Sequence, residues 1–364
     1  TAGGNFESLV TTDTSTVTVV DTIDTTSVSL TAAPDLTEDG GNLTYTATLG
    51  SPVLAGDDPV VVSFTDLNGA ARSITITGGN ATGTYVATIP EALYEDVYSE
   101  AAADITIATN VSVAGGNFEA LGTPSVGTIA LTDSIDNTNA TLTSVGSGDE
   151  DNGSITYTVT LNNAPQADQL FSITLSNGQS ATITVASGAL TGAITFGWGA
   201  GAIAGTQALT GYPNSDAYSE APVDISVSTF TASGAGGNFE QLTPINSSTP
   251  VTIADTITPT TITLSDVNGA EGTSHTITAT VDHVVTGNDL VITLSNGKEI
   301  TIAVGATSGT SAAFAIQSDD VYVDGDAYSV GISGTAGGNF ESLVTTDTST
   351  VTVSDTLDAV TAVL

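Results

Sequence analysis

The sequence predicts an all-β protein made of tandem immunoglobulin-like β-sandwich domains arranged end to end. The first observation behind this prediction is a repeated phrase, Ala-Gly-Gly-Asn-Phe-Glu, which starts at Ala2, Ala114, Ala235 and Ala336. Successive copies lie about 100–120 residues apart, a spacing that fits a whole domain better than a short solenoid coil. The second observation is the abundance of short Thr/Val/Ile-rich segments separated by turn residues, which favours strands.

The two ends of the chain indicate how the repeats are divided. Thr1–Asp24 and Thr335–Asp358 have nearly the same sequence. We therefore interpret residues 1–25 as the last strand and linker of a preceding repeat, and 359–364 as the start of a following one. The three complete repeats are expected at 26–136, 137–258 and 259–358. The chain is accordingly interpreted as a piece of a longer protein.

Each repeat is expected to contain seven strands. Leu43, Tyr45, Ala47 and Leu49 alternate with threonines, which is the period-two pattern of a half-buried strand. The other strand segments of the first repeat are Ser27–Ala32, Val60–Phe64, Ser73–Thr77, a strand ending at Ile89, a sixth strand before Gly115, and Val126–Leu131. Seven short strands in about 100 residues are typical of an immunoglobulin-like sandwich.

A β-hairpin is expected at the same place in every repeat. Two strand segments flank Asn68-Gly69 in the first repeat, and Asn177-Gly178 and Asn296-Gly297 occupy the same position in the second and third. Asn-Gly between two alternating segments is the strongest short-range hairpin signal, because both residues accept a positive φ.

Two further local features are expected near the sixth strand. Tyr98, Tyr218 and Tyr328 stand where the tyrosine corner of this fold lies. Tyr328 is closer than the other two to its following Gly-Gly pair, so the first two repeats are expected to have a longer sixth strand or an insertion there. The second repeat also carries Gly197-Trp198-Gly199 and a Gly/Ala run to Gly205, where we expect a decorated loop or a short helix.

The amino-acid composition limits the partners of this protein. Two basic residues face forty acidic ones, and the net charge of −38 excludes nucleic acid and anionic membranes as direct partners, because both bind Lys and Arg. A hydrophobic fraction of 40% and a charged fraction of only 12% indicate a folded chain. The sequence has no cysteine for a disulfide, and no apolar run of the ~18–20 residues that a membrane-spanning helix needs.

The acidic residues are expected to gather at one end of each sandwich, because alternate loops of an antiparallel fold share an end. Clustered carboxylates without basic partners repel each other until a cation neutralises them, and ~6–8 hard oxygen ligands favour calcium. The predicted calcium ligands are Glu38, Asp39, Asp96, Glu100, Asp133 and Asp136 in the first repeat; Asp149, Glu150, Asp151, Asp216, Glu220 and Asp255 in the second; and Glu271, Asp319, Asp320, Asp324, Asp326, Asp355 and Asp358 in the third. The same end is expected to hold Asp66, Glu95 and Asp266. The simpler alternative is that these are solvated loop acids.

The Gly-Gly-Asn-Phe-Glu phrase is expected at the opposite end, facing the Asp-x-x-Asp signature that ends the preceding repeat. Its Asn and Glu then become calcium ligands across each junction: Asn117 and Glu119 with Asp21 and Asp24, Asn238 and Glu240 with Asp133 and Asp136, and Asn339 and Glu341 after the second repeat. The phrase also suits a tight turn with positive φ while Phe118 fills the core. We expect both roles.

These phrases, with Asp-Thr-Ile-Asp, Leu-Ser-Asn-Gly and Asp-Gly-Asp-Ala-Tyr-Ser, resemble the tandem calcium-dependent immunoglobulin-like extender repeats of giant bacterial RTX adhesins, which are exported by type I secretion. The acid-rich loop before the sixth strand is also similar to Calx-β domains. The resemblance covers the whole chain, and it implies Ca²⁺ as cofactor, adjacent repeats as partners and an extracellular location on the bacterial surface. One departure is Thr258, which replaces the second acid of the signature after repeat two and implies different or weaker calcium binding there.

The leading functional prediction is a calcium-rigidified spacer that projects a distal adhesive tip for surface attachment and biofilm formation. Two alternatives remain open: a ligand- or glycan-binding module around Trp198, and a surface-layer structural protein. An enzyme is not expected. The chain has two histidines, His275 and His283, and no H-E-x-x-H or G-x-S-x-G motif. Carboxylate pairs that could serve glycoside hydrolysis recur with the repeat, whereas an active site is seldom triplicated.

Overall fold

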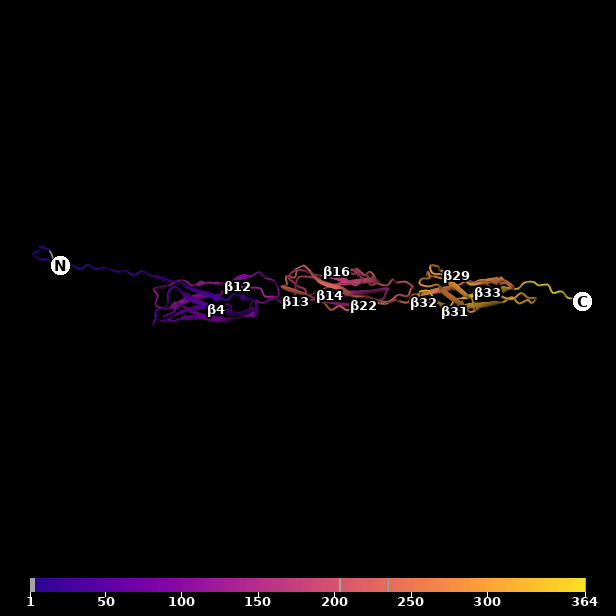
Figure 1. The fold of residues 1–364 in the computed structure, drawn as a ribbon, viewed down its shortest axis with the longest axis horizontal. Coiled ribbons are helices and arrows are strands. Elements are labelled where there is room, and N and C mark those ends of the chain that lie inside the picture. The colour runs from indigo at the N-terminus through magenta and orange to yellow at the C-terminus, as the bar shows by residue number, and fades with distance from the viewer. Residues whose placement is uncertain (1–3, 203, 235, 364) are drawn as a thin grey trace. The chain divides into compact units, whose positions relative to one another are not determined.

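The computed structural model describes residues 4–202, 204–234 and 236–363. Ala2 and Ala235 of the repeated phrase, Ile203 of the Gly/Ala run and the two chain ends lie outside this description. The chain forms two compact units: residues up to Thr138 with Phe239–Gln241, and Asn139–Asn238 with the residues from Leu242 onward. The first unit contains one β-sandwich and the second contains two, so the predicted all-β fold of tandem immunoglobulin-like sandwiches is confirmed for the described residues (Figure 1).

Sandwich one has strands β1 (Thr25–Thr26), β2 (Val28–Ala33), β3 (Leu36–Thr37), β4 (Gly40–Leu49), β5 (Val60–Thr65), β6 (Ala71–Ile76), β7 (Thr82–Pro90), β8 (Ala103–Thr106), β9 (Thr109–Gly115), β10 (Ala120–Leu121), β11 (Ser125–Val126) and β12 (Thr128–Thr132), with a short 3₁₀ helix η1 (Glu91–Leu93). In one layer β4 pairs antiparallel with β2 and β7. In the other layer β5 pairs antiparallel with β6 and β9. β12 pairs parallel with β3 and antiparallel with β8, and the β3–β4 pair joins these strands to the sheet of β4. The sixth strand of the fold is thus β8 followed by β9.

The core of sandwich one follows the period-two pattern. Leu43, Tyr45, Ala47 and Leu49 of β4 are buried, and the threonines between them are only partly covered. They pack against the buried side chains of β2 and β5 in one contiguous cluster. Each fully buried aliphatic side chain stabilises the fold by roughly 1.5–3 kcal/mol, so this aliphatic packing holds the two layers together without a disulfide.

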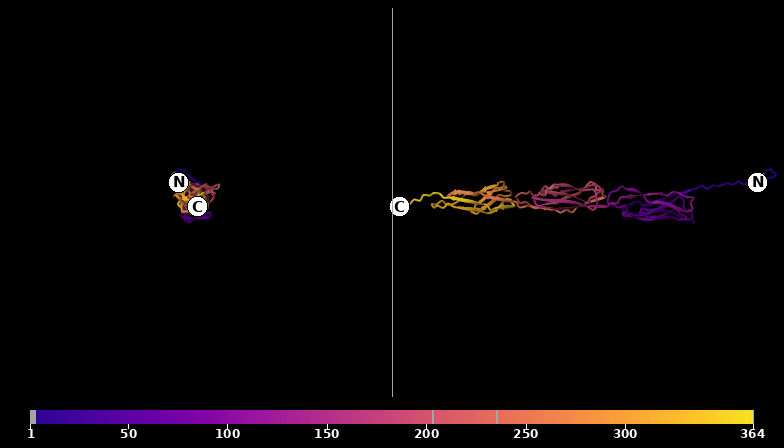
Figure 2. Two further views of the ribbon diagram at one scale, coloured as in Figure 1. Left: turned by 90° about the vertical axis from the view of Figure 1, so that its right-hand side faces the viewer. Right: turned by 180° about the vertical axis from the view of Figure 1, so that it is seen from behind.

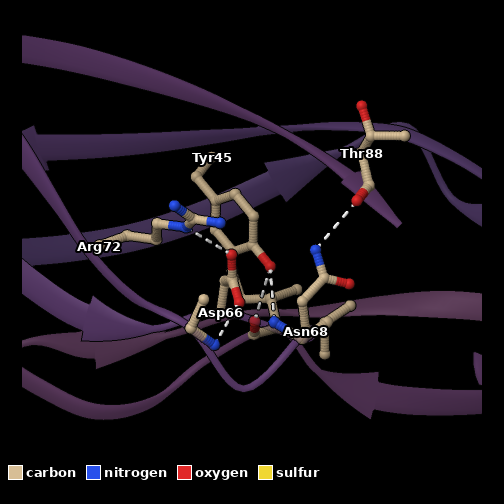
Figure 3. A network of polar contacts seen from close by, with 8 residues as sticks. Tyr45, Asp66, Asn68, Arg72 and Thr88 are labelled. Carbon is tan, nitrogen blue, oxygen red and sulfur yellow. Dashed lines mark hydrogen bonds and ion pairs between the residues drawn. The ribbon is translucent and has the colours of Figure 1, made fainter. Parts of the chain in front are cut away.

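A buried polar network fixes the β5–β6 hairpin of sandwich one (Figure 3). The Asp66 carboxylate accepts hydrogen bonds from Arg72 Nε and from the Ala70 N–H, both at 2.9 Å. The Tyr45 hydroxyl, which lies beside it in the core, accepts a hydrogen bond from the Leu67 N–H at 3.2 Å. Asp66 is therefore paired with Arg72 and does not belong to the acidic group of sandwich one.

The three expected hairpins are present. Gly69, Gly178 and Gly297 have φ values of +74°, +84° and +76°, which only glycine adopts without strain, and the flanking strands pair antiparallel in each case. In sandwich one the turn is also tied to β7, because the Asn68 side-chain amide donates to the Thr88 carbonyl at 2.9 Å.

Sandwich two has strands β13 (Asn137–Gly148), β14 (Asn152–Leu161), β15 (Gln169–Leu175), β16 (Ser180–Val185), β17 (Thr191–Gly199), β18 (Gln207–Ala208), β19 (Val223–Ile225), β20 (Val227–Ser233), β21 (Gln241–Asn246) and β22 (Val251–Ile253). β14 lies between β13 and β17 in one sheet, and β15 lies between β16 and β20 in another. The sixth strand is again divided, because β19 pairs with β22 and β20 pairs with β15.

Sandwich three has strands β23 (Pro259–Leu264), β24 (Val267–Ala270), β25 (Ser274–His275), β26 (Thr278–Val281), β27 (Leu290–Leu294), β28 (Glu299–Ile302), β29 (Ser308–Thr310), β30 (Phe314–Ala315), β31 (Ala327–Ala336), β32 (Ser342–Val344) and β33 (Thr348–Ser354). Here the sixth strand is continuous: the first half of β31 pairs with β33 and its second half with β27. The long strands of each sandwich run side by side in the front and back views (Figure 1, Figure 2).

The predicted longer sixth strand in the first two repeats is present only to a small extent, because 103–115 and 223–233 exceed β31 (Ala327–Ala336) by three residues and by one. The segment 103–115, the segment 223–233 and β31 fill the same place in the three sandwiches. The difference in spacing arose because Tyr328 lies inside β31, whereas Tyr98 and Tyr218 lie in the loop before the sixth strand.

The decorated loop of sandwich two is a strand extension followed by a turn. β17 runs through Trp198 to Gly199, and the Gly201 and Ala202 N–H groups then donate back to the Trp198 and Gly199 carbonyls. β18 pairs parallel with the end of β17. The part of this segment that the structure describes contains no helix.

Residues 4–24 contain no strand, although Thr348–Ser354 in the matching segment is β33. In sandwich three this segment is flanked by β24 and β31, to which it pairs. The same side chains near the N-terminus, such as Val17 and Val19, are exposed. An isolated strand is not stable in water, so nearly the same sequence forms a strand only where partner strands are present.

Candidate metal centres

One buried glutamate in each sandwich stands at the same structural position. Glu38, Glu150 and Glu271 follow the first long strand and are 6%, 1% and 3% exposed. Their N–H groups donate to the carbonyls of Thr132, Ala254 and Ser354, each of which directly precedes an aspartate of the seventh-strand tail. This backbone register brings each glutamate to the first aspartate of the Asp-x-x-Asp signature.

Three acidic groups result among the described residues. In each group one ligand atom per residue lies within 4.8 Å of the others, the distance range in which several side chains can share one cation. The groups are Glu38, Glu100, Asp133 and Glu240 in the first unit, and Glu150, Asp255 and Glu341, and Glu271, Asp324 and Asp355, in the second. The predicted clustering of acids is therefore real for these ten residues.

The same oxygen atoms are left unpaired in each group. Glu38, Glu150 and Glu271 each have a buried Oε2 without a hydrogen-bond partner among the described residues, and the same is true of Oδ1 in Asp133, Asp255 and Asp355, and of Oε1 in Glu240 and Glu341. A buried charged oxygen without a partner costs more than the ~1–3 kcal/mol of a neutral group. Solvated loop acids would not show this pattern, so the simpler alternative does not account for these residues.

The electrostatics of the groups are those of crowded carboxylates. Burial, together with the charges of Asp133 and Glu100, raises the pKa of Glu38 to about 7. Burial also raises the pKa values of Glu150, Glu240 and Glu341, with added repulsion from Asp255 at the first and third and from Asp133 at the second. The shifts express the cost of placing several negative charges together without a counter-ion.

The glutamate of the repeated phrase makes the same backbone contact three times. Glu119 Oε2 accepts a hydrogen bond from the Asp24 N–H at 2.5 Å. Glu240 Oε2 accepts one from the Asp136 N–H, and Glu341 Oε2 accepts one from the Thr258 N–H. The last position of the Asp-x-x-Asp signature thus contributes its backbone N–H as a hydrogen-bond donor to the glutamate. Thr258 supplies this donor just as an aspartate does.

A loop with the pattern Asp-x-Tyr-x-Glu/Asp lies beside each acidic group. The tyrosine N–H donates to Oδ1 of the preceding aspartate in Asp96–Tyr98 at 2.7 Å, Asp216–Tyr218 at 2.8 Å and Asp320–Tyr322 at 2.9 Å. Two residues after the tyrosine comes Glu100, Glu220 or Asp324. The equivalent of Tyr98 and Tyr218 is therefore Tyr322, and the predicted equivalence with Tyr328 is wrong. Tyr328 nevertheless has a corner-like bond, because its hydroxyl donates to the upstream Ile316 carbonyl at 3.0 Å.

Several predicted ligands lie outside the three groups. Three of them, Asp96, Asp216 and Asp320, accept the tyrosine N–H bonds described above. Asp149 Oδ1 accepts hydrogen bonds from the Asp151 and Asn152 N–H groups, and Asp326 Oδ1 accepts one from the Ala327 N–H. Asp266, which the sequence also placed at this end, accepts a hydrogen bond from the Thr350 N–H. Asn238 and Asn339 donate their side-chain amides to Gln166 Oε1 and the Ser219 carbonyl. Asp21, Asp24, Asp39, Asn117, Glu119, Asp136 and Asp358 are exposed, and Asp151 and Asp319 accept hydrogen bonds from threonine hydroxyls at the rim.

Glu220 and Glu95 lie next to the acidic groups without belonging to them. The Glu220 N–H donates to Asp255 Oδ2 at 3.0 Å, and its Oε2 is buried without a partner within the described chain, so Glu220 borders the second group. Glu95 Oε2 accepts a hydrogen bond from Ser134 Oγ at 3.0 Å. Burial and the neighbouring Asp136 raise the pKa of Glu95.

Trp198 plays a part that the sequence did not indicate. Its indole is 2% exposed and lies tilted against the Tyr212 ring, with centroids 5.6 Å apart and an interplanar angle of 40°. Its Nε1–H donates to the Asp149 carbonyl at 2.6 Å. It therefore anchors the loop that carries Glu150. A buried indole is not presented to a glycan, so the alternative of a glycan-binding loop around Trp198 is not supported by its position.

Threonine hydroxyls were also missed. Thr256 Oγ1 donates to Glu150 Oε1 at 2.8 Å, and Thr356 Oγ1 donates to Glu271 Oε1 at 3.0 Å. Each orients one oxygen of the buried glutamate and leaves the other, Oε2, facing the acidic group. The signal was present in the sequence, because both threonines directly follow the first aspartate of the signature.

The fold and the recurring groups define a class of protein: an acidic array of immunoglobulin-like sandwiches with oxygen-rich clusters of the kind that hold divalent cations. The chain belongs to the LapA domain family, which matches residues 24–134, 136–256 and 258–356. The protein is thus a set of three tandem LapA domains, a family of structural repeats.

The comparison with solved structures adds little to this assignment. The I9–I11 tandem from titin is 11% identical over 92% of this chain and 98% of that chain, with a TM-score of 0.18. Escherichia coli alpha-2-macroglobulin activated by porcine elastase is 7% identical over 91% of this chain and 44% of that chain, with a TM-score of 0.21. At such TM-scores neither similarity supports an argument about function.

No match was found among curated proteins. Within residues 4–202, 204–234 and 236–363, no helix has the length and apolar character to cross a membrane.

Proposed function

We propose that this chain is a calcium-binding extender segment of a LapA-type bacterial surface adhesin, located outside the cell. In this proposal Ca²⁺ stiffens the junctions between sandwiches, so that the array projects an adhesive tip for surface attachment and biofilm formation. The observation that carries the proposal is the recurrence of the same unpaired, buried carboxylate oxygens in all three sandwiches. Membership of the LapA domain family supports the adhesin assignment.

The chemistry of the acidic groups favours calcium among the common cations. The three groups consist of carboxylates alone, without histidine or cysteine, which suits a hard cation rather than zinc or copper. Calcium accepts ~6–8 oxygens in flexible geometry, whereas magnesium requires a near-octahedral set and retains its waters. Three or four carboxylates, some binding through both oxygens, leave room for water or backbone carbonyls to complete a calcium site.

The second unit shows how such an ion would stiffen a junction. Glu150 and Asp255 belong to sandwich two, whereas Glu341 precedes β32 of sandwich three. A cation bound to all three carboxylates would hold both sandwiches at once. It would also neutralise the repulsion that raises the pKa values of Glu150 and Glu341, so binding and junction closure are coupled.

Thermal unfolding in chelator and in millimolar calcium tests the proposal, with equilibrium dialysis to count bound ions. A ligand that binds the folded state alone stabilises it by about 2.7 kcal/mol at a hundredfold excess over Kd, so the melting temperature should rise by several degrees in calcium. Glu150→Gln should reduce this rise, and Glu299→Gln, at an exposed position in β28, should leave it unchanged. Identical melting curves with and without calcium would contradict the proposal.

A further inference from the structure

We propose that Asn296, in the β27–β28 hairpin of sandwich three, is a site of spontaneous deamidation, and that the fold protects Asn68 and Asn177 in the matching hairpins. The reaction converts the asparagine amide to an aspartate or isoaspartate carboxylate, and water is its only co-reactant. The inference concerns a covalent modification and goes beyond the proposed calcium function.

Deamidation makes specific demands on the residues around the asparagine. The backbone nitrogen of the following residue attacks Cγ of the side-chain amide, loses its proton to solvent and expels ammonia, which closes a succinimide ring. Water then opens the ring at either carbonyl and gives aspartate or isoaspartate. A following glycine favours the attack because it has no Cβ and turns easily. The asparagine side chain must also be free to swing onto the backbone.

The three hairpins present the same Asn-Gly pair in the same backbone turn. Gly69, Gly178 and Gly297 have φ values of +74°, +84° and +76°. Their N–H groups each donate to the carbonyl three residues earlier, at 2.9, 3.0 and 2.9 Å. Because the backbone is equivalent in the three turns, differences in reactivity must come from the asparagine side chains.

In sandwich one the asparagine side chain is tied to a neighbouring strand. Asn68 Nδ2 donates to the Thr88 carbonyl of β7 at 2.9 Å (Figure 3). Ring closure requires the amide to turn onto the Gly69 nitrogen, so this hydrogen bond must break first.

In sandwich two the asparagine is tied through a longer chain of contacts. Asn177 Nδ2 donates to the Thr210 carbonyl at 2.5 Å. Thr210 is itself held by Gln179, whose Oε1 accepts from the Thr210 N–H at 3.2 Å and whose Nε2 donates to the Ala208 carbonyl at 2.7 Å. A Cβ on Gly211 would lie 3.3 Å from Asn177 Cβ, so this segment also covers the side chain.

Asn296 in sandwich three lacks such a tether. It is exposed, and within the described residues its Nδ2 has no hydrogen-bond acceptor. Its Oδ1 accepts a hydrogen bond from the Lys298 N–H at 3.1 Å, as Asn177 Oδ1 does from the Gln179 N–H at 3.0 Å. This bond within the turn keeps Cγ close to the intervening Gly297 nitrogen. The attacked carbon is thus positioned, and the departing amide nitrogen is open to solvent.

The two other Asn-Gly pairs of the sequence lie in strands. Asn152 is the first residue of β14 and pairs with Gly199, and Asn268-Gly269 lies inside β24, which pairs with β33. Ladder hydrogen bonds must break before the backbone of a strand can turn toward its own side chain. Asn296 should therefore react first.

The modification would alter the hairpin that contains it. Each product adds a negative charge to a chain whose net charge is already −38. Isoaspartate also adds a methylene to the main chain, which lengthens the turn that the Gly297 N–H closes with the Leu294 carbonyl. Deamidation should therefore loosen the β27–β28 hairpin as the protein ages.

Ageing the full chain in warm, mildly alkaline buffer tests the inference, because deprotonation of the attacking nitrogen promotes ring closure. Mass spectrometry of digested samples gives the rate at each Asn-Gly pair, and isoaspartate methyltransferase labels the isoaspartate product. Breaking a hydrogen bond of ordinary net strength slows a step by about two- to tenfold, so Asn296 should react at least about twofold faster than Asn68 and Asn177. Asn296→Gln should remove most of the label, because glutamine closes a larger ring more slowly.

Two comparisons connect the rates to the fold. In urea the folded contacts are lost, and the hairpin asparagines should react at similar rates. Gln179→Ala releases the segment that holds Asn177, so it should accelerate deamidation of Asn177 by about two- to tenfold. Asn296 of the same molecule is the internal control and should be unaffected.

The contrary results are equally specific. Equal rates at Asn68, Asn177 and Asn296 in the folded chain would overturn the inference, and so would a faster reaction at Asn152 or Asn268. An Asn296 that reacts in urea but stays intact in the folded chain would show that the fold protects it too. An unchanged rate at Asn177 in Gln179→Ala would overturn the protective role of the tether.

Discussion

Thr258 illustrates that a residue can keep its structural role while its side chain changes. Its N–H donates to Glu341 as the N–H groups of Asp24 and Asp136 donate to Glu119 and Glu240. The expectation of weaker calcium binding at this junction assumed that the fourth position acts through its side chain. A backbone N–H donates whatever the side chain is, so the change from Asp to Thr is no longer a reason to expect weaker binding. The calcium affinity of this junction stays untested.

Loss of Arg72 should destabilise the β5–β6 hairpin of sandwich one. Arg72 pairs with buried Asp66 and lies over the Tyr85 ring, 5.3 Å from the ring centroid. In Arg72→Ala the Asp66 carboxylate keeps the Ala70 N–H but loses its charged partner, which should destabilise the hairpin by about 1–3 kcal/mol.

Hydrogen exchange of the β5 and β6 amides measures this effect locally, since an array of sandwiches need not unfold in a single step. Those amides should exchange faster in Arg72→Ala. Lys298→Ala, in the matching hairpin of sandwich three, is the control. Unchanged exchange in β5 and β6 would show that the ion pair does not stabilise the hairpin.

Glu38 should make stability depend on pH when calcium is removed. Its pKa in the folded protein is raised from 4.5 to about 7, first by burial and then by Asp133, so the folded state holds the proton more tightly than the unfolded chain does. Its contribution to stability is therefore full below pH 4.5 and is lost as the pH rises through about 7.

We expect the melting temperature in chelator to fall across this pH range less steeply in Glu38→Gln than in the unchanged protein. A neutral amide has no proton to lose, so this difference isolates Glu38 from the other acids. Glu91→Gln, at an exposed position in η1, serves as the control. Parallel pH profiles for the unchanged protein and Glu38→Gln would contradict the assignment.

At the scale of elements, the loops that carry the acidic groups are held by the strands beside them. The seventh strand fixes each buried glutamate through one backbone hydrogen bond, and in sandwich two β17 adds the bond from Trp198 to the Asp149 carbonyl. The Gly148 and Gly153 backbone lies so close to the Trp198 ring that a Cβ at either position would come within 2.8 Å and 2.2 Å of it. A movement of this loop would therefore change the surroundings of the Trp198 ring.

The fluorescence of Trp198, the sole tryptophan of the sequence, should report calcium binding to the second acidic group. Ordering of the Asp149–Asp151 loop changes the environment of the indole, so the emission should shift in a calcium titration. Glu150→Gln should abolish the shift, whereas Glu271→Gln, the same change in sandwich three, should preserve it. A shift that survives Glu150→Gln would show that the indole responds to something else.

At the scale of the whole molecule, the proposed function concerns motion between sandwiches, and the second unit offers a direct measurement. The chain has no cysteine, so Thr182→Cys in β16 and Thr301→Cys in β28 would carry two spin labels at exposed positions. Calcium should narrow the distribution of distances between the labels, because Glu150, Asp255 and Glu341 then bind one ion. Pulsed electron paramagnetic resonance measures this distribution.

Two variants make the measurement specific. Glu341→Gln removes the ligand that sandwich three contributes and should keep the distribution broad in calcium. Glu299→Gln changes the same type of residue away from the junction and should behave like the parent. A distribution that is equally narrow in chelator would mean that the Tyr218–Phe340 stack and its backbone bridge hold the junction without an ion.

The sequence by itself determined the fold class, the Asn-Gly hairpins and the alternating core of β4, because these depend on local periodicity and turn chemistry. It also pointed to Glu38, Glu150 and Glu271 as members of acidic clusters, since the signal repeats with the domain. The repeat boundaries at 26–136, 137–258 and 259–358 remain predictions. Only the tertiary structure decided which acidic side chains lie close together. Parallel pairing with the seventh strand places each buried glutamate beside one aspartate. Asp66 instead forms an ion pair with Arg72, and Asp266 accepts a hydrogen bond from the Thr350 N–H. The role of Tyr322 was also visible only in the structure, because in the sequence the nearby Tyr328-Ser329 pair matched Tyr98-Ser99 better. The absence of strands in residues 4–24 could not be predicted either, because long-range partners and not local sequence determine whether a strand forms.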